Sequence, residues 1–121
     1  MNYAIIGCGL IGKKRLAGLP AGSKLVVACD TNPARANELV KLAGTGRVVA
    51  DFKQAITSPE VDAVIVATFN SLLAEISASA IRAGKPVLVE KPAGVSVKQI
   101  DELIALAKRH DVCVQIGRAH V

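Results

Sequence analysis

The fold is decided by Asn2-Tyr3-Ala4-Ile5-Ile6-Gly7-Cys8-Gly9-Leu10-Ile11-Gly12. A short apolar run breaks into three glycines and then continues at helical spacing, which predicts a strand, a tight turn and a helix. Such a turn presents free backbone N–H groups and the positive end of a helix dipole, and both attract phosphate. We expect Gly7 to allow the sharp exit from the strand, Gly9 to let the backbone approach a pyrophosphate, and Gly12 to bring the helix close to the sheet.

The rest of the chain alternates between apolar runs and amphipathic segments. Helix starts are indicated by Asn32 before Pro33, by Asp51 with Gln54, and by Ser96 with Gln99, the last two as capping boxes. Alternation of this kind predicts a doubly wound parallel sheet of the α/β class with a Rossmann fold. Further strands are predicted at 25–30, 47–50, 62–68, 87–89 and 112–116, and further helices at 33–43, 52–57, 71–83 and 97–107.

Size and composition favour one domain over residues 1–121. Half of the residues (51%) are hydrophobic and only 2% are aromatic, which suits an aliphatic sheet covered by helices on both faces. No apolar run approaches the roughly 18 residues of a membrane span, and the first apolar run is too short for a signal peptide. We therefore expect a cytoplasmic protein without a membrane partner.

The charge of +5 comes from basic residues scattered along the chain, and few aromatic residues accompany them, so we expect no nucleic-acid partner. The one dense basic run, 13–15, is interpreted as solvated helix surface. Cys8, Cys29 and Cys113 are odd in number, widely spaced and set in apolar runs. We expect three buried thiols and no metal site.

Polar residues follow several predicted strands, at the edge where such sheets bind ligands. Asp30 lies eighteen residues beyond Gly12, close to the spacing at which a carboxylate binds an adenosine ribose in dinucleotide sites. The alternative is that Asp30 caps the next helix, although Thr31 and Asn32 are available for that. A carboxylate at the ribose repels a 2′-phosphate, so NAD is favoured, and Arg35 leaves NADP open.

Two further strand ends carry candidate site residues. Thr68 and Asn70 follow one strand, and a plain helix cap is the alternative role for Asn70. Lys91 stands between Glu90 and a proline, whose stiff backbone holds the lysine in place. Lys91 is therefore a candidate hydrogen-bond donor or proton-transfer group that Glu90 orients, and the alternative is a surface lysine in a turn.

These motifs resemble the N-terminal half of the Gfo/Idh/MocA oxidoreductases, most specifically through Glu90-Lys91-Pro92, and also through the three glycines, Cys29-Asp30 and Ala67-Thr68 with Asn70. The resemblance implies an NAD(P)-binding Rossmann domain with Lys91 near the nicotinamide as the catalytic residue. It also implies substrates with a hydroxyl or carbonyl group, such as a sugar or inositol. The implied cofactor-binding residues are Gly7, Gly9, Leu10, Ile11, Gly12, Asp30, Thr31, Thr68, Asn70, Glu90 and Lys91.

Three positions depart from the family pattern, which often has histidine at Arg15, proline at Phe69 and histidine at Leu73. Leu73 would remove a polar group from the face near the cofactor. Family members also carry a second domain that supplies the substrate pocket and usually a catalytic histidine. That domain is missing from these 121 residues, so a small-molecule substrate and a homo-oligomer are expectations for a longer protein.

The leading hypothesis is the dinucleotide-binding domain of an NAD(P)-dependent oxidoreductase. We expect no turnover from these residues alone, because they lack a pocket that positions a substrate and excludes water. A standalone module that binds or senses NAD(H) without catalysis is the second hypothesis. A methyltransferase-like nucleotide pocket is the third. For Asp30→Ala we expect weaker NAD binding with the fold intact.

Overall fold

A computed structural model describes residues 1–68, 72–90 and 96–117 of the chain. Strands and helices alternate throughout, as the sequence predicts. In chain order they are β1 (Asn2–Ile6), α1 (Leu10–Ala17), β2 (Lys24–Cys29), α2 (Pro33–Ala43), β3 (Arg47–Val49), α3 (Phe52–Thr57), β4 (Ala63–Val66), α4 (Leu72–Arg82), β5 (Val87–Glu90), α5 (Val97–Arg109) and β6 (Val114–Gly117).

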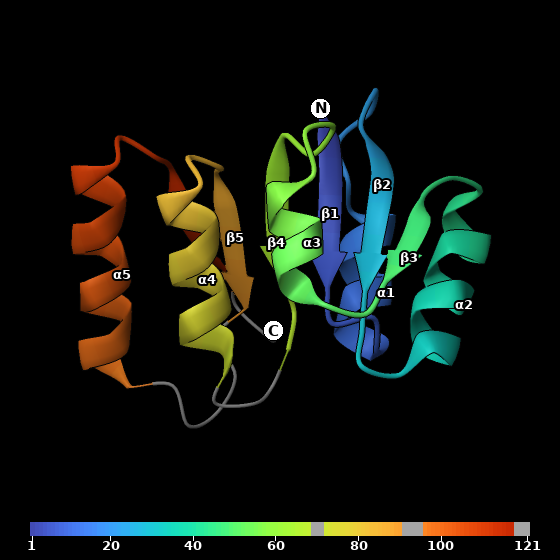
Figure 1. Ribbon diagram of the computed structural model, residues 1–121, viewed down its shortest axis with the longest axis horizontal. Coiled ribbons are helices and arrows are strands. Elements are labelled where there is room, and N and C mark those ends of the chain that lie inside the picture. The colour runs from blue at the N-terminus through green and yellow to red at the C-terminus, as the bar shows by residue number, and fades with distance from the viewer. Residues whose placement is uncertain (69–71, 91–95, 118–121) are drawn as a thin grey trace.

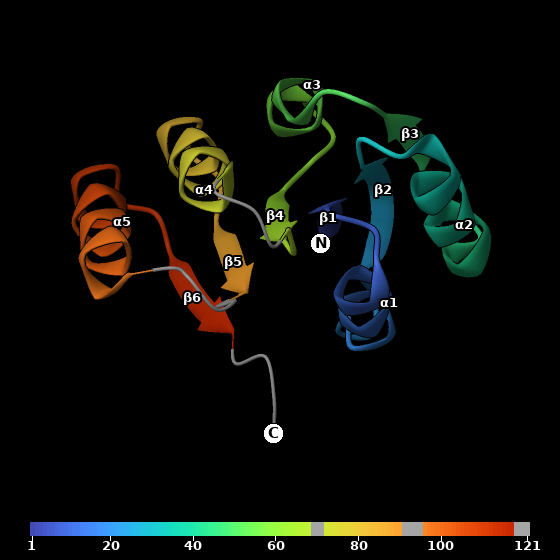
Figure 2. The same ribbon diagram turned by 90° about the horizontal axis from the view of Figure 1, so that it is seen from below.

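The six strands form one sheet in the order β3-β2-β1-β4-β5-β6, and every described pair is parallel. The strands point downward in Figure 1, and Figure 2 looks at their carboxyl ends. The order reverses between β1 and β4, where Ile5 is in register with both Ala28 and Ile65. Open parallel sheets bind ligands at such a switch point. The predicted doubly wound Rossmann fold is confirmed.

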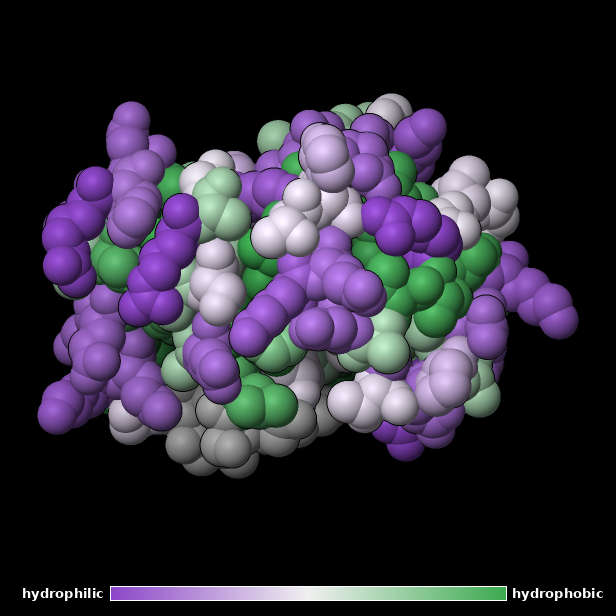
Figure 3. Space-filling model, in the orientation of Figure 1, coloured by the Kyte–Doolittle hydropathy of each residue, from purple (hydrophilic) through white to green (hydrophobic). Residues whose placement is uncertain are grey.

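Apolar side chains fill both faces of the sheet, because successive residues of a strand point to opposite sides. Ala4 and Ile6 of β1 pack in a cluster with residues of α3, α4 and α5. Ile5 points the other way and packs with Ala36 and Leu39 of α2. Seen from the side of α3, α4 and α5, hydrophilic side chains cover most of the surface (Figure 3). The core therefore lies between the sheet and two helical layers.

The predicted helix starts are largely confirmed. Asn32 caps α2, and Ser96 and Gln99 form the complete capping box of α5. Asp51 caps α3 by accepting from the N–H of the second helical residue, not the third. In that described helix, the side chain of Gln54 makes no bond back to Asp51 either, so the predicted capping box is not formed and Asp51 acts as a simple cap.

Two glycines allow the turn after β1 to pack against its neighbours. Gly7 has a φ of +96°, and a Cβ placed on it would lie 2.6 Å from the carbonyl oxygen of Ala67, beyond β4. A Cβ on Gly12 would overlap the carbonyl oxygen of Gly7. The fold therefore requires glycine at both positions, which confirms the expected sharp exit and the close approach of the helix.

The prediction of a buried Cys113 is wrong. Its side chain is exposed, because it precedes β6, an edge strand that pairs only with β5 in the described sheet. It borders a cavity of about 510 Å³ between β4–β6 and α1, on a face where no described helix covers β5 and β6 (Figure 2).

The predicted start of the last strand is also wrong. Strand β6 begins at Val114 and not at Val112, because the N–H of Val112 still bonds the carbonyl of Ala107 at the end of α5.

Leu73 does not lie on an open face near the proposed ligand site, contrary to expectation. It is 1% exposed and lies in the cluster on the inner side of α4. A histidine there would have to place a polar ring in an apolar core. The physical role of Leu73 here is therefore packing.

No helix in the described parts of the chain is long and apolar enough to cross a membrane.

Replacement of Gly7 with alanine should destabilise the fold strongly. Gly22 also has a positive φ but has no atom within 4 Å of a built Cβ, so Gly22→Ala is the matched control. We expect Gly22→Ala to cost about 1–2 kcal/mol of unfolding free energy from backbone strain alone. Gly7→Ala should cost about 1–3 kcal/mol more, because its Cβ overlaps backbone. Urea titrations measure both, and equal losses would contradict the close contact with Ala67.

Candidate dinucleotide site

Gly9 differs from the other two glycines of the turn, because the fold does not require it. Its φ is −78°, which any residue adopts, and a Cβ built on it meets no atom within 4 Å. Gly9 also lines a cleft at the carboxyl edge of the sheet. A side chain at this position would therefore project into the cleft without disturbing the protein. The space beside Gly9 fits a group that approaches the backbone from outside.

The amino end of α1 points into the same cleft. Gly9 is its N-cap residue and provides no side-chain acceptor, and the first bond of the helix runs from the N–H of Lys13 to the carbonyl of Gly9 at 3.0 Å. The preceding N–H groups of the first turn therefore have neither a helical nor a capping acceptor. Together with the helix dipole they form a site for an anion such as a pyrophosphate.

Asp30 joins the glycine turn to the end of β2. Its Oδ2 accepts from the N–H of Cys8 at 2.8 Å, and its Oδ1 accepts from the N–H of Asn32 at 2.8 Å. Asn32 itself caps α2 by accepting from Ala34 at 3.0 Å. The capping role considered for Asp30 therefore belongs to Asn32. A carboxylate has about four acceptor sites, so two acceptor sites of Asp30 are left for ribose hydroxyls.

These bonds also correct our expectation for Asp30→Ala. Alanine would remove both acceptors, leaving the half-buried N–H of Cys8 without its partner. An unsatisfied buried donor costs about 1–3 kcal/mol. The substitution should therefore weaken the fold as well as any nucleotide binding.

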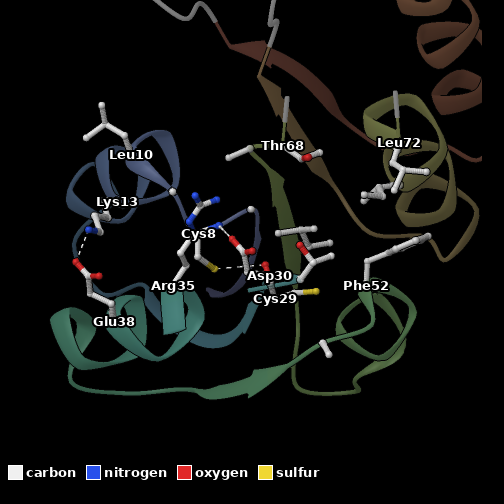
Figure 4. A pocket seen from close by; sticks show the side chains of 17 residues that line it. Cys8, Leu10, Lys13, Cys29, Asp30, Arg35, Glu38, Phe52, Thr68 and Leu72 are labelled. Atoms are coloured by element: carbon white, nitrogen blue, oxygen red, sulfur yellow. Dashed lines mark hydrogen bonds and ion pairs between the residues drawn. The ribbon is translucent and has the colours of Figure 1, made fainter. Parts of the chain in front are cut away.

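The cleft has a volume of about 730 Å³, large enough for part of a dinucleotide, and two kinds of wall (Figure 4). The glycine turn, Asp30 and residues of α1 and α2 form a polar wall. Phe52 and Leu72 lie on the opposite side, together with the adjoining Ala50 and Ile76, and form an apolar wall. A cleft of this kind can hold an anion at one wall and a flat apolar ring at the other.

Six of the predicted site residues line this cleft: Gly7, Gly9, Leu10, Asp30, Thr31 and Thr68. Ile11 and Gly12 are the second and third residues of α1, and neither lines the cleft; Gly12 is buried under the turn. Glu90 is the last residue of β5, in register with Gly117. Asn70 and Lys91 lie outside the described residues, and their proposed roles stay predictions.

Sequence reasoning missed the apolar wall. Phe52 and Leu72 begin two different helices, and Ile76 is one turn further along the second. Their approach depends on how α3 and α4 meet across the switch point, which no local pattern encodes. One signal was present, since Phe52 is one of only two phenylalanines in the chain.

The interpretation of the basic run 13–15 as solvated helix surface is incomplete. Lys13 is not simply solvated, because its ammonium pairs with Glu38 of α2 at the rim of the cleft. Arg35 lies on the same rim, and Figure 4 shows its side chain reaching from α2 toward the glycine turn and Asp30.

Two thiols lie beneath the cleft. Burial, reinforced by the nearby Asp30 carboxylate, raises the pKa of Cys8 to about 12. Burial raises the pKa of Cys29 to about 11, again with a contribution from Asp30. Both thiols are therefore neutral at physiological pH and act as packing groups. Among the described residues, no group of three His, Cys, Asp or Glu side chains is arranged to hold a metal ion.

Comparison with known proteins agrees with this geometry. Residues 1–118 match the Gfo/Idh/MocA family model, described as an oxidoreductase family with an NAD-binding Rossmann fold. The chain belongs to the Gfo/Idh/MocA family. It is 38% identical over 95 residues to inositol 2-dehydrogenase 2 of Saccharopolyspora erythraea, an alignment that covers 76% of this chain and 28% of that protein.

Solved structures that are similar to this chain include one complex with NAD and one with NADP+. GenD2 from gentamicin A biosynthesis, in complex with NAD, superimposes with a TM-score of 0.85 at 29% identity over 97% of this chain and 34% of that one. Biliverdin reductase from Synechocystis sp. PCC 6803, in complex with biliverdin and NADP+, gives 0.81 at 25% identity over 95% and 37%. The present chain spans about a third of the length of these proteins and corresponds to their NAD(P)-binding Rossmann domain.

Thiol modification can test the burial of the cysteines. In the native chain at pH 8 we expect one thiol per molecule to react with a disulfide reagent, because Cys113 is exposed while Cys8 and Cys29 are buried and protonated. After unfolding, all three should react. Cys113→Ser is the control and should leave the native chain unreactive. Fast reaction of two or three thiols in the native chain would contradict the structure.

Proposed function

We propose that this chain is the dinucleotide-binding domain, residues 1–121, of an oxidoreductase that interconverts a hydroxyl and a carbonyl group on a sugar, an inositol or a related small molecule. The relative from Saccharopolyspora erythraea, an inositol 2-dehydrogenase, supports this substrate class. In a longer protein, a second domain would supply the substrate pocket. A cytoplasmic location and homo-oligomeric assembly stay predictions.

The observation that carries the proposal is the glycine at position 9. Gly7 and Gly12 are required by the fold, whereas neither the φ nor the packing of Gly9 requires glycine. A glycine that the fold does not require leaves open space beside the backbone, which supports the approach of a ligand at this point. The N–H groups at the start of α1 lie at the same place and suit a pyrophosphate.

The other cleft residues would orient the dinucleotide, with its adenosine end and its nicotinamide end on different sides of the glycine turn. Asp30, oriented by the N–H of Cys8, would accept from the hydroxyls of the adenosine ribose. The apolar wall of Phe52, Leu72 and Ile76 would hold the adenine ring. The nicotinamide end would then extend past Thr68 toward the carboxyl ends of β4 and β5. Because a carboxylate repels a 2′-phosphate, we propose NAD as the preferred cofactor.

When bound, NAD accepts a hydride from an alcohol, or NADH donates one to a carbonyl. The residue we propose for the accompanying proton is Lys91. Its ammonium can donate a proton to the reacting oxygen when the carbonyl is reduced, and its neutral amine can take the proton when the alcohol is oxidised. A lysine held next to the strand-end Glu90 suits this role better than a role in simple sensing. We propose that turnover needs the second domain, which would exclude water from that oxygen.

Gly9→Ala should weaken cofactor binding without affecting the fold. The new methyl group meets no protein atom but occupies the approach of the pyrophosphate. We expect the Kd for NADH, measured by calorimetry, to rise at least tenfold, which corresponds to about 1.4 kcal/mol. Gly18→Ala, at the other end of α1 and outside the cleft, should leave the Kd unchanged.

Unchanged NADH affinity in Gly9→Ala would refute the proposed pyrophosphate position. The same titration with S-adenosylmethionine separates the methyltransferase-like alternative. Tight binding of S-adenosylmethionine without binding of NADH would end the oxidoreductase proposal.

Lys91→Ala can be tested in a longer protein that combines this domain with a substrate domain. We expect the Kd for NADH to change less than twofold, while kcat falls by about a hundredfold or more, the usual contribution of a positioned proton-transfer group. Lys98→Ala removes an exposed lysine of α5 and is the control. Normal turnover of Lys91→Ala would rule out a catalytic role.

A further inference from the structure

Four charged side chains surround the polar wall of the cleft. Asp30 follows β2, Lys13 lies in α1, and Arg35 and Glu38 lie three residues apart on one face of α2. Lys13 and Glu38 are joined by an ion pair across the two helices (Figure 4). Two positive and two negative charges therefore border the place proposed for the adenosine ribose.

The two cations on this rim differ in their partners. Within the described structure, the guanidinium of Arg35 forms neither an ion pair nor a hydrogen bond, whereas the ammonium of Lys13 is held by the Glu38 carboxylate. Lysine is a point charge on a flexible four-carbon stem, and it binds phosphate readily when no carboxylate competes. Glu38 thus competes directly with any phosphate that would approach Lys13.

We propose that Glu38 is a specificity-determining residue that favours NAD over NADP. It does so by holding Lys13 and by adding a second negative charge to the cleft that Asp30 lines. This inference rests on the proposed dinucleotide site. NADP differs from NAD by a 2′-phosphate that carries about −1.5 to −2 charge at pH 7. The rim charges act on that group and have little effect on the parts that the two cofactors share.

The ion pair has no comparable structural role. Side chains of Lys13 and Glu38 are 35% and 55% exposed, and pairs as exposed as this contribute little to stability. Both residues can therefore be replaced without unfolding the protein. An electrostatic role also has a signature that packing lacks, because salt screens it.

Glu38→Gln tests the proposal with the 121-residue chain. Glutamine keeps the size of the side chain and removes its charge, which frees Lys13. At low salt we expect the Kd for NADPH to fall about three- to tenfold, the range for one unit charge near a phosphate in a mostly aqueous setting. The Kd for NADH should change less than twofold. At 0.5 M salt most of the gain for NADPH should disappear.

Two further variants isolate the pair. Lys13→Gln leaves Glu38 without its partner and should weaken NADPH binding while NADH binding is unchanged. The double variant should return the ratio of the two Kd values close to that of the wild type, because it removes one positive and one negative charge together. Glu102→Gln, on the exposed surface of α5, removes the same charge far from the cleft and should have no effect.

The outcomes distinguish this inference from the proposed function. If the wild-type chain binds NADH and Glu38→Gln leaves the NADPH-to-NADH ratio unchanged, the role of Glu38 is refuted while the dinucleotide site stands. Equal changes for both cofactors, or a gain that survives high salt, would also refute it. If the wild-type chain binds neither cofactor, the proposed function itself fails.

Discussion

The structure depends on a close contact between backbones at the end of β1. Gly7 lies against the carbonyl of Ala67 beyond β4, and Gly12 brings the first turn of α1 onto Gly7 itself. No side chain fits between these segments, so the exit of β1, the end of β4 and the start of α1 are fixed relative to one another. This contact directs the amino end of α1 toward the cleft at the switch point of the sheet.

Asp30 adds a polar link to this backbone framework. By accepting from the N–H groups of Cys8 and Asn32, it ties the glycine turn to the segment that starts α2. The residue proposed to bind the ribose is therefore also part of the loop structure, and its two roles cannot be separated by deleting the side chain. Gly9 is the opposite case. It contributes to the proposed binding site and nothing in the fold depends on it.

The order of strands and helices could be predicted from sequence because each element has a local sequence pattern. Apolar runs and helical periods identified the strands and helices, and Asn32 and Ser96 identified two helix starts. The edge that holds the cofactor also followed, because parallel strands place Gly9, Asp30 and Thr68 at the same end of the sheet. Family resemblance then added the expected position of Lys91 near the nicotinamide and the expected class of substrate.

The remaining features depend on tertiary contacts that no local pattern specifies. Phe52 and Leu72 form one wall only because α3 and α4 lie side by side on the same face of the sheet. Lys13 and Glu38 pair because α1 and α2 lie on the same face, a relation between residues far apart in the sequence. Cys113 looked like a core residue because its neighbours are apolar, but an edge strand that is covered on one side leaves it exposed.

The position of Cys113 is useful because of the polarity of the sheet. It precedes β6, so it lies at the amino edge, whereas the cleft lies at the carboxyl edge. A fluorophore attached to this sulfur would sit at the opposite pole of the molecule from the nucleotide. The native sequence thus already contains a single anchoring point for surface immobilisation or distance measurements in which the nucleotide pocket stays unobstructed.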